Sequence, residues 1–485
     1  MKLNTTLKDF KKNHLKRNNQ IIYFSENCLS YKKIENLFKY ILSKKNSFIF
    51  ESVEKGKVKG RYTIIGYNTD KVWDIRKNNL KVTFNNKIKK IKVDPLKFIN
   101  NLTKDFKVKI PKAIPPMASM LVGYFSYDII RYIENIPDNC KDDLDIPDIR
   151  ILRPKNLVIY DNLKKKIFYI QNIFSDNKIA NYSQEYDNIK KKINSLRFYC
   201  EINFPEKLTF KKNKFKIKSN ITKKQFKKNV VKAKKYISKG DIFQVVLSQR
   251  FERKFHKKPL EIYNYLRVSN PSPFMFYFNF DDFKILGSSP EILVRLRNNQ
   301  ITIRPIAGTR PRGQNISQDN KFKKELLRDK KELAEHLMLL DLGRNDVGKV
   351  SKVNTVNVTE RFKVEKYSHV MHIVSNVVGR FNHKVSIFEA LLAGFPAGTV
   401  SGAPKIRAME IIDELEKNKR KLYAGGIGYF TSNNEFDTCI ALRTALIKNN
   451  KFYVQAGAGI VADSNPEKEF IETINKAKAL MKAID

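Results

Sequence analysis

Cysteine is scarce in this sequence, and its placement favours neither disulfides nor a metal site. The four cysteines in 485 residues are scattered, and none forms a Cys-x-x-Cys pair. A chain of this length buries a sizeable core and does not need disulfide cross-links for stability. We therefore predict reduced thiols and a cytoplasmic protein.

Long apolar runs are also missing. No apolar stretch approaches the roughly 18 residues that a membrane-spanning helix requires. The first 20 residues are polar and lysine-rich, without the apolar segment of a secretion signal. We expect a protein that has no membrane partner.

Acidic residues are few relative to basic ones. The 49 Asp and Glu face 94 Lys and Arg, which gives a formal net charge of +45. A nucleic acid or a membrane surface is one explanation of such a charge. However, only 22 of the 94 basic residues are arginine, and the lysines are spread along the whole chain. Because the abundant Lys, Asn, Ile and Phe share AT-rich codons, we favour compositional bias and predict no nucleic-acid partner.

Glycine is sparse before residue 287 and concentrated after it. Fourteen of the 19 glycines lie between Gly287 and Gly459, together with several arginines. A bias toward lysine leaves arginine where a bidentate guanidinium is needed, and glycine where the backbone demands it. The chemistry is therefore predicted in the C-terminal half.

The chain divides into two predicted units. Residues 1–205 contain several stretches with strand-like alternation, and residues 220–485 form the second unit. The second unit opens at Thr222-Lys-Lys-Gln225, which has the form of a capping box before a helix. The polar, lysine-rich segment Phe204–Asn220 is the predicted linker.

Two predicted helices carry acidic residues in the second unit. One spans Lys321–Leu342, with Glu332 and Glu335 one turn apart beside an apolar stripe. The other begins at Ser464-Asn-Pro-Glu467, where a capping residue precedes a proline at the first helical position, and it carries Glu472. Glutamates on two helices suit a hard divalent cation. Solvated surface acids are the alternative that the spacing leaves open.

Other segments could bind an anion or move a proton. Three glycine segments could offer backbone N–H groups to an anion, although tight turns and close sheet packing are the alternative; they are Ile306–Arg310, Ala424–Gly428 and Gln455–Ile460. His369 and His372 lack a third soft ligand nearby, which favours a proton-transfer role over zinc. Arg443 lies in a strand-like pattern and is a candidate to pair with a carboxylate. No Ser or Cys lies in a nucleophile elbow, so nucleophilic acyl transfer by this chain is not expected.

Several long strings resemble the chorismate-utilising enzymes. They are Gly287–Glu291, Arg304–Arg312, Glu335–Asp346, Phe395–Lys405, Tyr423–Tyr429 and Glu472–Lys476, and the resemblance covers residues 222–483 densely. It implies an α+β fold of two interwoven domains, with large, mostly antiparallel packed β-sheets flanked by outer helices. Residues 1–205 would form an N-terminal regulatory domain, and residues 220–485 a chorismate-binding catalytic domain.

The resemblance also implies roles for individual residues. Glu335 and Glu472 are similar to the family's Mg²⁺ ligands, and the ion would hold the ring carboxylate of chorismate. Glu291 resembles the acid that protonates the departing 4-hydroxyl, and His372 resembles the histidine of the later elimination. The implied substrate contacts are Gly308, Thr309, Tyr423, Arg443, Gly457, Ala458 and Gly459, with Thr309 also in the catalytic set.

Two positions indicate which nucleophile attacks the ring. Ala307 stands where aminodeoxychorismate-forming members carry a lysine that attacks the ring covalently. Gln244 is similar in position to the lysine that activates water in isochorismate- and salicylate-forming members, and glutamine cannot act as a base. The resemblance therefore implies a magnesium-dependent lyase that uses ammonia and releases anthranilate and pyruvate. An aminodeoxychorismate-forming or other chorismate enzyme, and a basic nucleic-acid or surface-binding protein on a worn-out enzyme fold, are the alternatives.

Regulation and an ammonia source are implied as well. A pocket for tryptophan, the feedback inhibitor, would be lined by Ser52, Pro273, Phe274 and Met275, with Cys439 nearby. An interdomain core packed by Phe and Met is the plainer interpretation of the same residues, and the two are compatible. Because the chain lacks an elbow cysteine, it would use free ammonia or ammonia made from glutamine by a separate amidotransferase subunit, component II, in a heterotetramer.

Overall fold

A computed structural model describes residues 1–54, 58–202, 215–367 and 370–485. Residues 204–214 of the predicted linker, and His369, lie outside these ranges. The strands are β1 (Gln20–Asn27), β2 (Ser47–Glu51), β3 (Val53–Glu54), β4 (Val58–Lys59), β5 (Tyr62–Arg76), β6 (Asn79–Phe84), β7 (Lys87–Lys92), β8 (Met120–Phe125), β9 (Ile149–Asp161), β10 (Lys166–Ile173), β11 (Lys218–Ser219), β12 (Gln244–Lys254), β13 (Phe274–Asn279), β14 (Lys284–Ser289), β15 (Ile292–Arg297), β16 (Gln300–Ile303), β17 (Ile306–Pro311), β18 (Asn357–Lys366), β19 (Val370–Arg380), β20 (Gly402–Ala403), β21 (Gly426–Thr431), β22 (Phe436–Ile440), β23 (Thr444–Lys448) and β24 (Lys451–Ile460).

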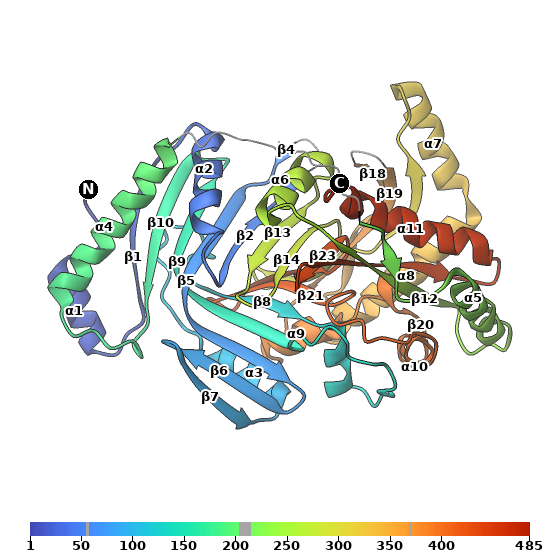
Figure 1. The fold of residues 1–485 in the computed structure, drawn as a ribbon, viewed down its shortest axis with the longest axis horizontal. Helices are drawn as coiled ribbons and strands as arrows, with labels where there is room; N and C mark the ends of the chain where they lie inside the picture. The colour runs from blue at the N-terminus through green and yellow to red at the C-terminus, as the bar shows by residue number, and fades with distance from the viewer. Residues whose placement is uncertain (55–57, 203–214, 368–369) are drawn as a thin grey trace.

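The helices flank these strands (Figure 1). They are α1 (Leu7–Leu15), α2 (Tyr31–Ile41), α3 (Pro95–Asp105), α4 (Tyr182–Glu201), α5 (Lys223–Ser238), α6 (Pro259–Ser269), α7 (Ile316–Arg328), α8 (Lys330–Gly348), α9 (Ile387–Ala393), α10 (Lys405–Leu415) and α11 (Pro466–Lys482), with short 3₁₀ helices η1 (Tyr127–Tyr132) and η2 (Gly398–Val400). None of the helices in the described ranges is long and apolar enough to cross a membrane.

Strands from the two halves of the chain pair directly with one another. The long strands β5 and β9 pair along most of their length, and β5 also pairs with β2 while β9 also pairs with β8. In turn β2 pairs with β13, and β8 pairs with β21. Each of these pairings is antiparallel. The predicted α+β fold with large antiparallel sheets and outer helices is confirmed, and sheets that continue across both halves make the halves interwoven.

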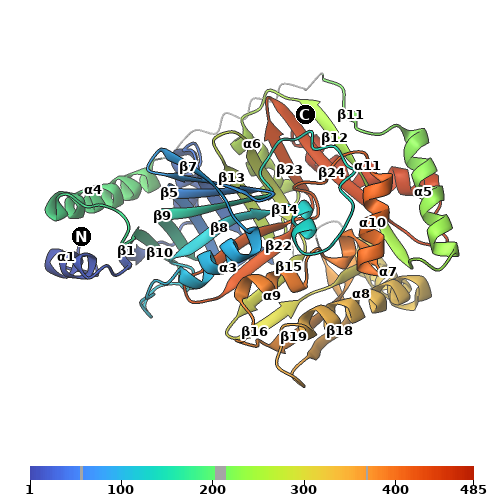
Figure 2. The ribbon, with the colours of Figure 1, turned by 90° about the horizontal axis from the view of Figure 1, so that it is seen from below.

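Alternation along the central strands separates two apolar cores. In β13, Phe276 and Phe278 belong to one core together with residues of β8 and β21, whereas Met275 and Tyr277 belong to another. This is the period of two that places successive side chains on opposite faces of a sheet. Helices α2, α4, α6 and α11 cover the second core. A third core forms where α5 and α10 pack on β12 and β24, at the end of the molecule opposite α1 and α4 (Figure 2).

The sequence signals for helix starts have mixed outcomes. Thr222 caps α5 by accepting a hydrogen bond from the backbone N–H of Gln225, as predicted, but the Gln225 side chain donates to Asn229 and does not complete a capping box. Asn465 caps α11 directly before Pro466, as the predicted start Ser464-Asn-Pro-Glu467 requires. The predicted single helix Lys321–Leu342 is wrong, because α7 ends and α8 begins at Asp329. The carboxylate of Asp329 accepts from two backbone N–H groups of α8, and this local cap outweighs the continuous apolar period.

Candidate active site

A bulge in the pairing of β17 with β19 brings Thr309 and His372 together. The register shifts between Ala307 and Thr309, and Gly308 lies between them with φ of +69°. A Cβ atom at Gly308 would lie 3.2 Å from the Oε2 atom of Glu332. A residue other than glycine would also be strained by the positive φ. Glycine at this position therefore permits the bulge that presents Thr309 beside His372.

The imidazole of His372 has a defined hydrogen-bond pattern. Its Nδ1 atom lies 3.0 Å from the carbonyl oxygen of Gly308 and 3.1 Å from the Oγ1 atom of Thr309. Because a carbonyl oxygen only accepts, the Nδ1 atom carries the proton in the neutral ring. Burial lowers the pKa of His372 to about 4. At neutral pH the ring is therefore uncharged, and its Nε2 atom is the basic one.

Glu291 is a buried carboxyl at the turn between β14 and β15. Its side chain accepts a hydrogen bond of 3.2 Å from the Oγ1 atom of Thr399, and burial raises its pKa to about 8. Burial and the charge of Glu365 raise the pKa of Tyr367. The Tyr367 ring contacts His372 edge-on at 5.5 Å between centroids. Burial thus raises the pKa of the Glu291 carboxyl and lowers that of His372, the histidine that contacts Tyr367.

Helices α8 and α11 bring Glu335 and Glu472 to the same site. Burial raises the pKa of Glu335, and the negative charge of Glu472 adds to the rise. Glu335 accepts a hydrogen bond of 2.9 Å from the Nε2 atom of Gln244, while Glu472 pairs with Lys476 at 2.7 Å. No group of three or more ligating side chains occurs in the described part of the chain. Two hard carboxylates that leave positions open for water or a substrate fit a magnesium ion.

Gly457 and Gly459 face this site from within strand β24, so of the two alternatives left open the structure shows close sheet packing and not a tight turn. Strand β24 pairs with β12 through Ser248 opposite Gly457 and Val246 opposite Gly459. A Cβ atom at Gly457 would lie 2.6 Å from the Tyr423 hydroxyl oxygen, and one at Gly459 would lie 2.6 Å from the Nε2 atom of Gln244.

The residue between the two glycines faces the other way. The Ala458 side chain packs in the core beneath α5 and α10, on the opposite side of the strand. Only the backbone of Ala458 is therefore left to meet a ligand at this site.

Arg443 was predicted to lie in a strand and to pair with a carboxylate, and the structure differs. It lies between β22 and β23 with φ of +46°, not inside a strand. Its guanidinium has no ion-pair or hydrogen-bond partner among the described residues, and burial lowers its pKa. Within the described part of the chain it is therefore not paired with a carboxylate. A half-buried guanidinium without such a partner is suited to an anionic ligand.

Comparison with known proteins identifies the family. Residues 46–482 match the model of a family described as chorismate binding enzyme. This chain belongs to the chorismate-binding enzymes. It is 43% identical to a Cereibacter sphaeroides protein named anthranilate synthase component 1, over 99% of this chain and 97% of that protein.

Two further comparisons agree with the family assignment. An Acetivibrio thermocellus protein of the same name is 46% identical, over 93% of this chain and 92% of that protein. The crystal structure of anthranilate synthase component I from Streptococcus pneumoniae has a TM-score of 0.77 at 36% identity, covering 87% of this chain and 92% of that one. The resemblance to chorismate-utilising enzymes stated from the motifs is confirmed.

The predicted tryptophan residues of this chorismate-binding enzyme lie where β2 and β13 meet. Met275 pairs with Glu51, the residue before Ser52, and its side chain is buried in the second core. Phe274 pairs with Ser289, which Cys439 contacts. Pro273 directly precedes Phe274 and is half-buried. The strand pairing thus gathers these residues from distant parts of the sequence, and their role stays a prediction.

Sequence reasoning missed three side chains that contact the site. Thr399 donates to Glu291, and the Tyr367 ring contacts the His372 ring edge-on. Lys476 donates to the carbonyl oxygen of Gly457 at 3.1 Å and pairs with Glu472. Thr399 and Lys476 stand inside strings that carry the family resemblance, so the signal was available. Nothing in the local pattern marked Tyr367.

Proposed function

We propose that this chorismate-binding enzyme converts chorismate and ammonia to anthranilate and pyruvate. The observation that carries the proposal is the amide of Gln244, which donates to Glu335 within the site. An amide cannot deprotonate water, and Ala307 on β17 supplies no amine to attack the ring. With water activation and attack by a lysine both excluded by these two side chains, ammonia is the remaining nucleophile. The names of the full-length relatives support this choice.

Chorismate carries two carboxylates, and the site offers two kinds of positive charge for them. Arg443 would bind one carboxylate as a bidentate fork. Glu335 and Glu472 would hold Mg²⁺, which supplies a Lewis acid for the ring carboxylate. The backbone around Gly308 and from Gly457 to Gly459, together with the Tyr423 hydroxyl, would contact the rest of the substrate.

The first chemical step needs an acid. Ammonia attacks C2, the ring double bonds shift, and the bond from C4 to its hydroxyl oxygen breaks. Glu291, which is protonated at neutral pH because burial raises its pKa to about 8, gives its proton to the leaving oxygen, so that water departs. The product of this step is aminodeoxyisochorismate.

The second step needs a base. The Nε2 atom of His372 takes the proton from C2, and the electron pair of that C–H bond forms the C2=C3 bond as the ether bond at C3 breaks. The enolpyruvate that leaves gains a proton on its methylene carbon and becomes pyruvate, and the ring becomes aromatic. The hydrogen bond from Nδ1 to Gly308 keeps Nε2 unprotonated for this role.

Ammonia would come from a separate subunit. All four cysteines are buried and free, and burial raises the pKa of each thiol, so none is suited to attack glutamine. A glutamine amidotransferase subunit in a heterotetramer would supply it. Tryptophan would inhibit by binding where Ser52 and Pro273–Met275 meet.

The test is product analysis. Purified protein with chorismate, Mg²⁺ and an ammonium salt at alkaline pH is expected to produce anthranilate, followed by its fluorescence, whereas glutamine in place of ammonium gives none. Aminodeoxychorismate or isochorismate as the sole product would overturn the proposal. Added tryptophan is expected to slow the reaction, and Ser52→Phe is expected to weaken that inhibition.

A further inference from the structure

Arg420 is a fully buried arginine that reaches three segments of the site. Its Nη1 atom donates to the carbonyl oxygen of Val400 at 2.7 Å, and its Nη2 atom donates to that of Val246 at 2.6 Å. Val400 follows the threonine that donates to Glu291, and Val246 lies two residues after Gln244 in β12. The guanidinium also lies 5.4 Å from the centre of the Tyr423 ring.

The charge of Arg420 is matched by one carboxylate. Glu416 accepts from its Nε atom at 2.9 Å and from its Nη2 atom at 2.6 Å. The same carboxylate accepts from the backbone N–H and the hydroxyl of Ser248, each at 2.8 Å, and therefore also anchors β12. Burial opposes the charge of Arg420, yet Glu416 keeps its pKa above the ordinary value. Only a planar fork with several donors makes all these bonds.

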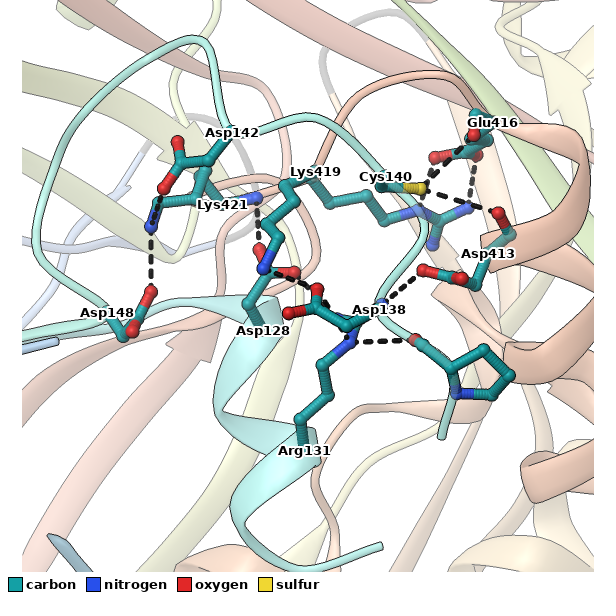
Figure 3. A network of polar contacts seen from close by, with 12 residues as sticks. Asp128, Arg131, Asp138, Cys140, Asp142, Asp148, Asp413, Glu416, Lys419 and Lys421 are labelled. Carbon is teal, nitrogen blue, oxygen red and sulfur yellow. Dashed lines mark hydrogen bonds and ion pairs between the residues drawn. The ribbon is translucent and has the colours of Figure 1, made fainter. Parts of the chain in front are cut away.

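The residues on either side of Arg420 bind the N-terminal half of the chain (Figure 3). Lys419 pairs with Asp138 at 2.5 Å. Lys421 pairs with Asp148 at 2.7 Å and with Asp142 at 3.0 Å. Its backbone N–H donates to Asp128. The two lysines thus fix the backbone at both sides of Arg420, while the Arg420 side chain points to the site.

We propose that Arg420 is a positioning residue that holds the Tyr423 hydroxyl against the backbone of Gly457 for chorismate binding. The carbonyl oxygen of Arg420 accepts from the N–H of Tyr423 at 3.1 Å. The Tyr423 side chain is buried, and its hydroxyl oxygen lies so close to Gly457 that a Cβ atom there would be 2.6 Å from it. Arg420 therefore contacts Tyr423 through both its backbone and its guanidinium. This inference rests on the proposed contact between Tyr423 and chorismate.

The experiment is a double-mutant cycle with Arg420→Lys and Tyr423→Phe. Lysine keeps the charge beside Glu416, so the variant is expected to fold, but it lacks the fork that reaches both carbonyls. Each single change is expected to weaken chorismate affinity by about tenfold, and the double variant by much less than the roughly hundredfold product of independent effects. The control is Arg197→Gln, which is expected to keep wild-type affinity. It removes a half-buried arginine that pairs with Glu26 at 2.9 Å.

Chorismate affinity is measured by titration calorimetry. The KM and kcat for anthranilate formation are measured on the same preparations. Losses that multiply fully in the double variant, or an Arg420→Lys affinity within twofold of wild type, would overturn the positioning role. Thermal unfolding checks that each variant is folded. Wild-type protein that binds chorismate but makes no anthranilate refutes the proposed function alone, because the affinity cycle does not depend on the product.

Discussion

The Nδ1 atom of His372 donates to the carbonyl oxygen of Gly308 across 3.0 Å. The acceptor is available because Gly308 adopts a positive φ in the bulge of β17 and turns its carbonyl toward β19. One backbone conformation thus fixes the tautomer of a side chain on the neighbouring strand. The basic Nε2 atom that results is the group we assign to the elimination step.

His372→Asn is expected to stop the reaction after its first step. The asparagine amide retains a donor near the Nδ1 position but removes the base at Nε2. We expect chorismate consumption to continue while anthranilate formation falls by about 10²–10⁴-fold, the usual contribution of a general base. Aminodeoxyisochorismate is then expected to accumulate, as chromatography of the products would show. The exposed His383→Asn is the control, and loss of both steps together in His372→Asn would contradict the assignment.

Activity is expected to fall as the pH rises through about 8, once the rate is expressed per free ammonia. Glu291 must be protonated to act as an acid, and its pKa is raised to about 8 by burial. The fraction of the acid form, and with it kcat/KM for chorismate, therefore decreases above that pH. Initial rates from pH 6.5 to 9.5 would show this limb. A flat profile would exclude Glu291 as the acid.

The raised pKa of Glu291 also implies that the stability of the protein depends on pH. The folded-state pKa of Glu291 lies above its unfolded value, so its contribution to stability is complete below the unfolded pKa and is lost as pH rises through the folded pKa. Glu291→Gln does not titrate. We expect its free energy of unfolding, relative to wild type, to increase by up to roughly 1.4 kcal/mol per pH unit between pH 5 and 8. Urea unfolding at both pH values measures it, and an unchanged difference would contradict the raised pKa.

Glu335→Gln and Glu472→Gln are each expected to remove Mg²⁺-dependent turnover without unfolding the protein. Each change replaces an anionic ligand with a neutral amide, which binds magnesium poorly. Mg²⁺ titration by calorimetry in the presence of chorismate measures the loss directly. The matched control is Glu467→Gln. Glu467 lies on the same helix, just over one turn before Glu472, and pairs with Lys223 at 2.5 Å. A variant whose activity still rises with Mg²⁺ as in wild type would remove that residue from the metal site.

Local sequence rules predicted the features that depend on neighbouring residues. Thr222 and Pro466 mark real helix starts, because capping chemistry acts over three or four residues. The same rules, applied to Asp329, would have separated α7 from α8. Glu335 and Glu472 lie on helices α8 and α11, and their joint role as metal ligands stays a prediction.

Features that depend on residues distant in the sequence could not be predicted from local sequence rules. Gly457 and Gly459 lack side chains because a Cβ atom at either position would meet the Tyr423 hydroxyl, from the turn before β21, or the side chain of Gln244, from β12. Arg443 pairs with no carboxylate among the residues that the structure describes, and it lies outside a strand because β22 ends at Ile440. The interwoven pairing of β2 with β13 and of β8 with β21 likewise follows from tertiary packing and has no local signal.

Lys421→Met is expected to destabilise the junction between the two halves of the chain. The Lys421 side chain is 1% exposed and is bound by Asp148 and Asp142. Its removal leaves Asp148 buried without its cation, and breaking such a pair typically costs about 3–5 kcal/mol of unfolding free energy. Adding Asp148→Asn removes the uncompensated charge, so the double variant is expected to recover part of that loss. Urea unfolding measures the stability of the single and double variants, and Lys417→Met, at an exposed position, is the control. A Lys421→Met protein as stable as that control would show that the ion pairs add nothing to the junction.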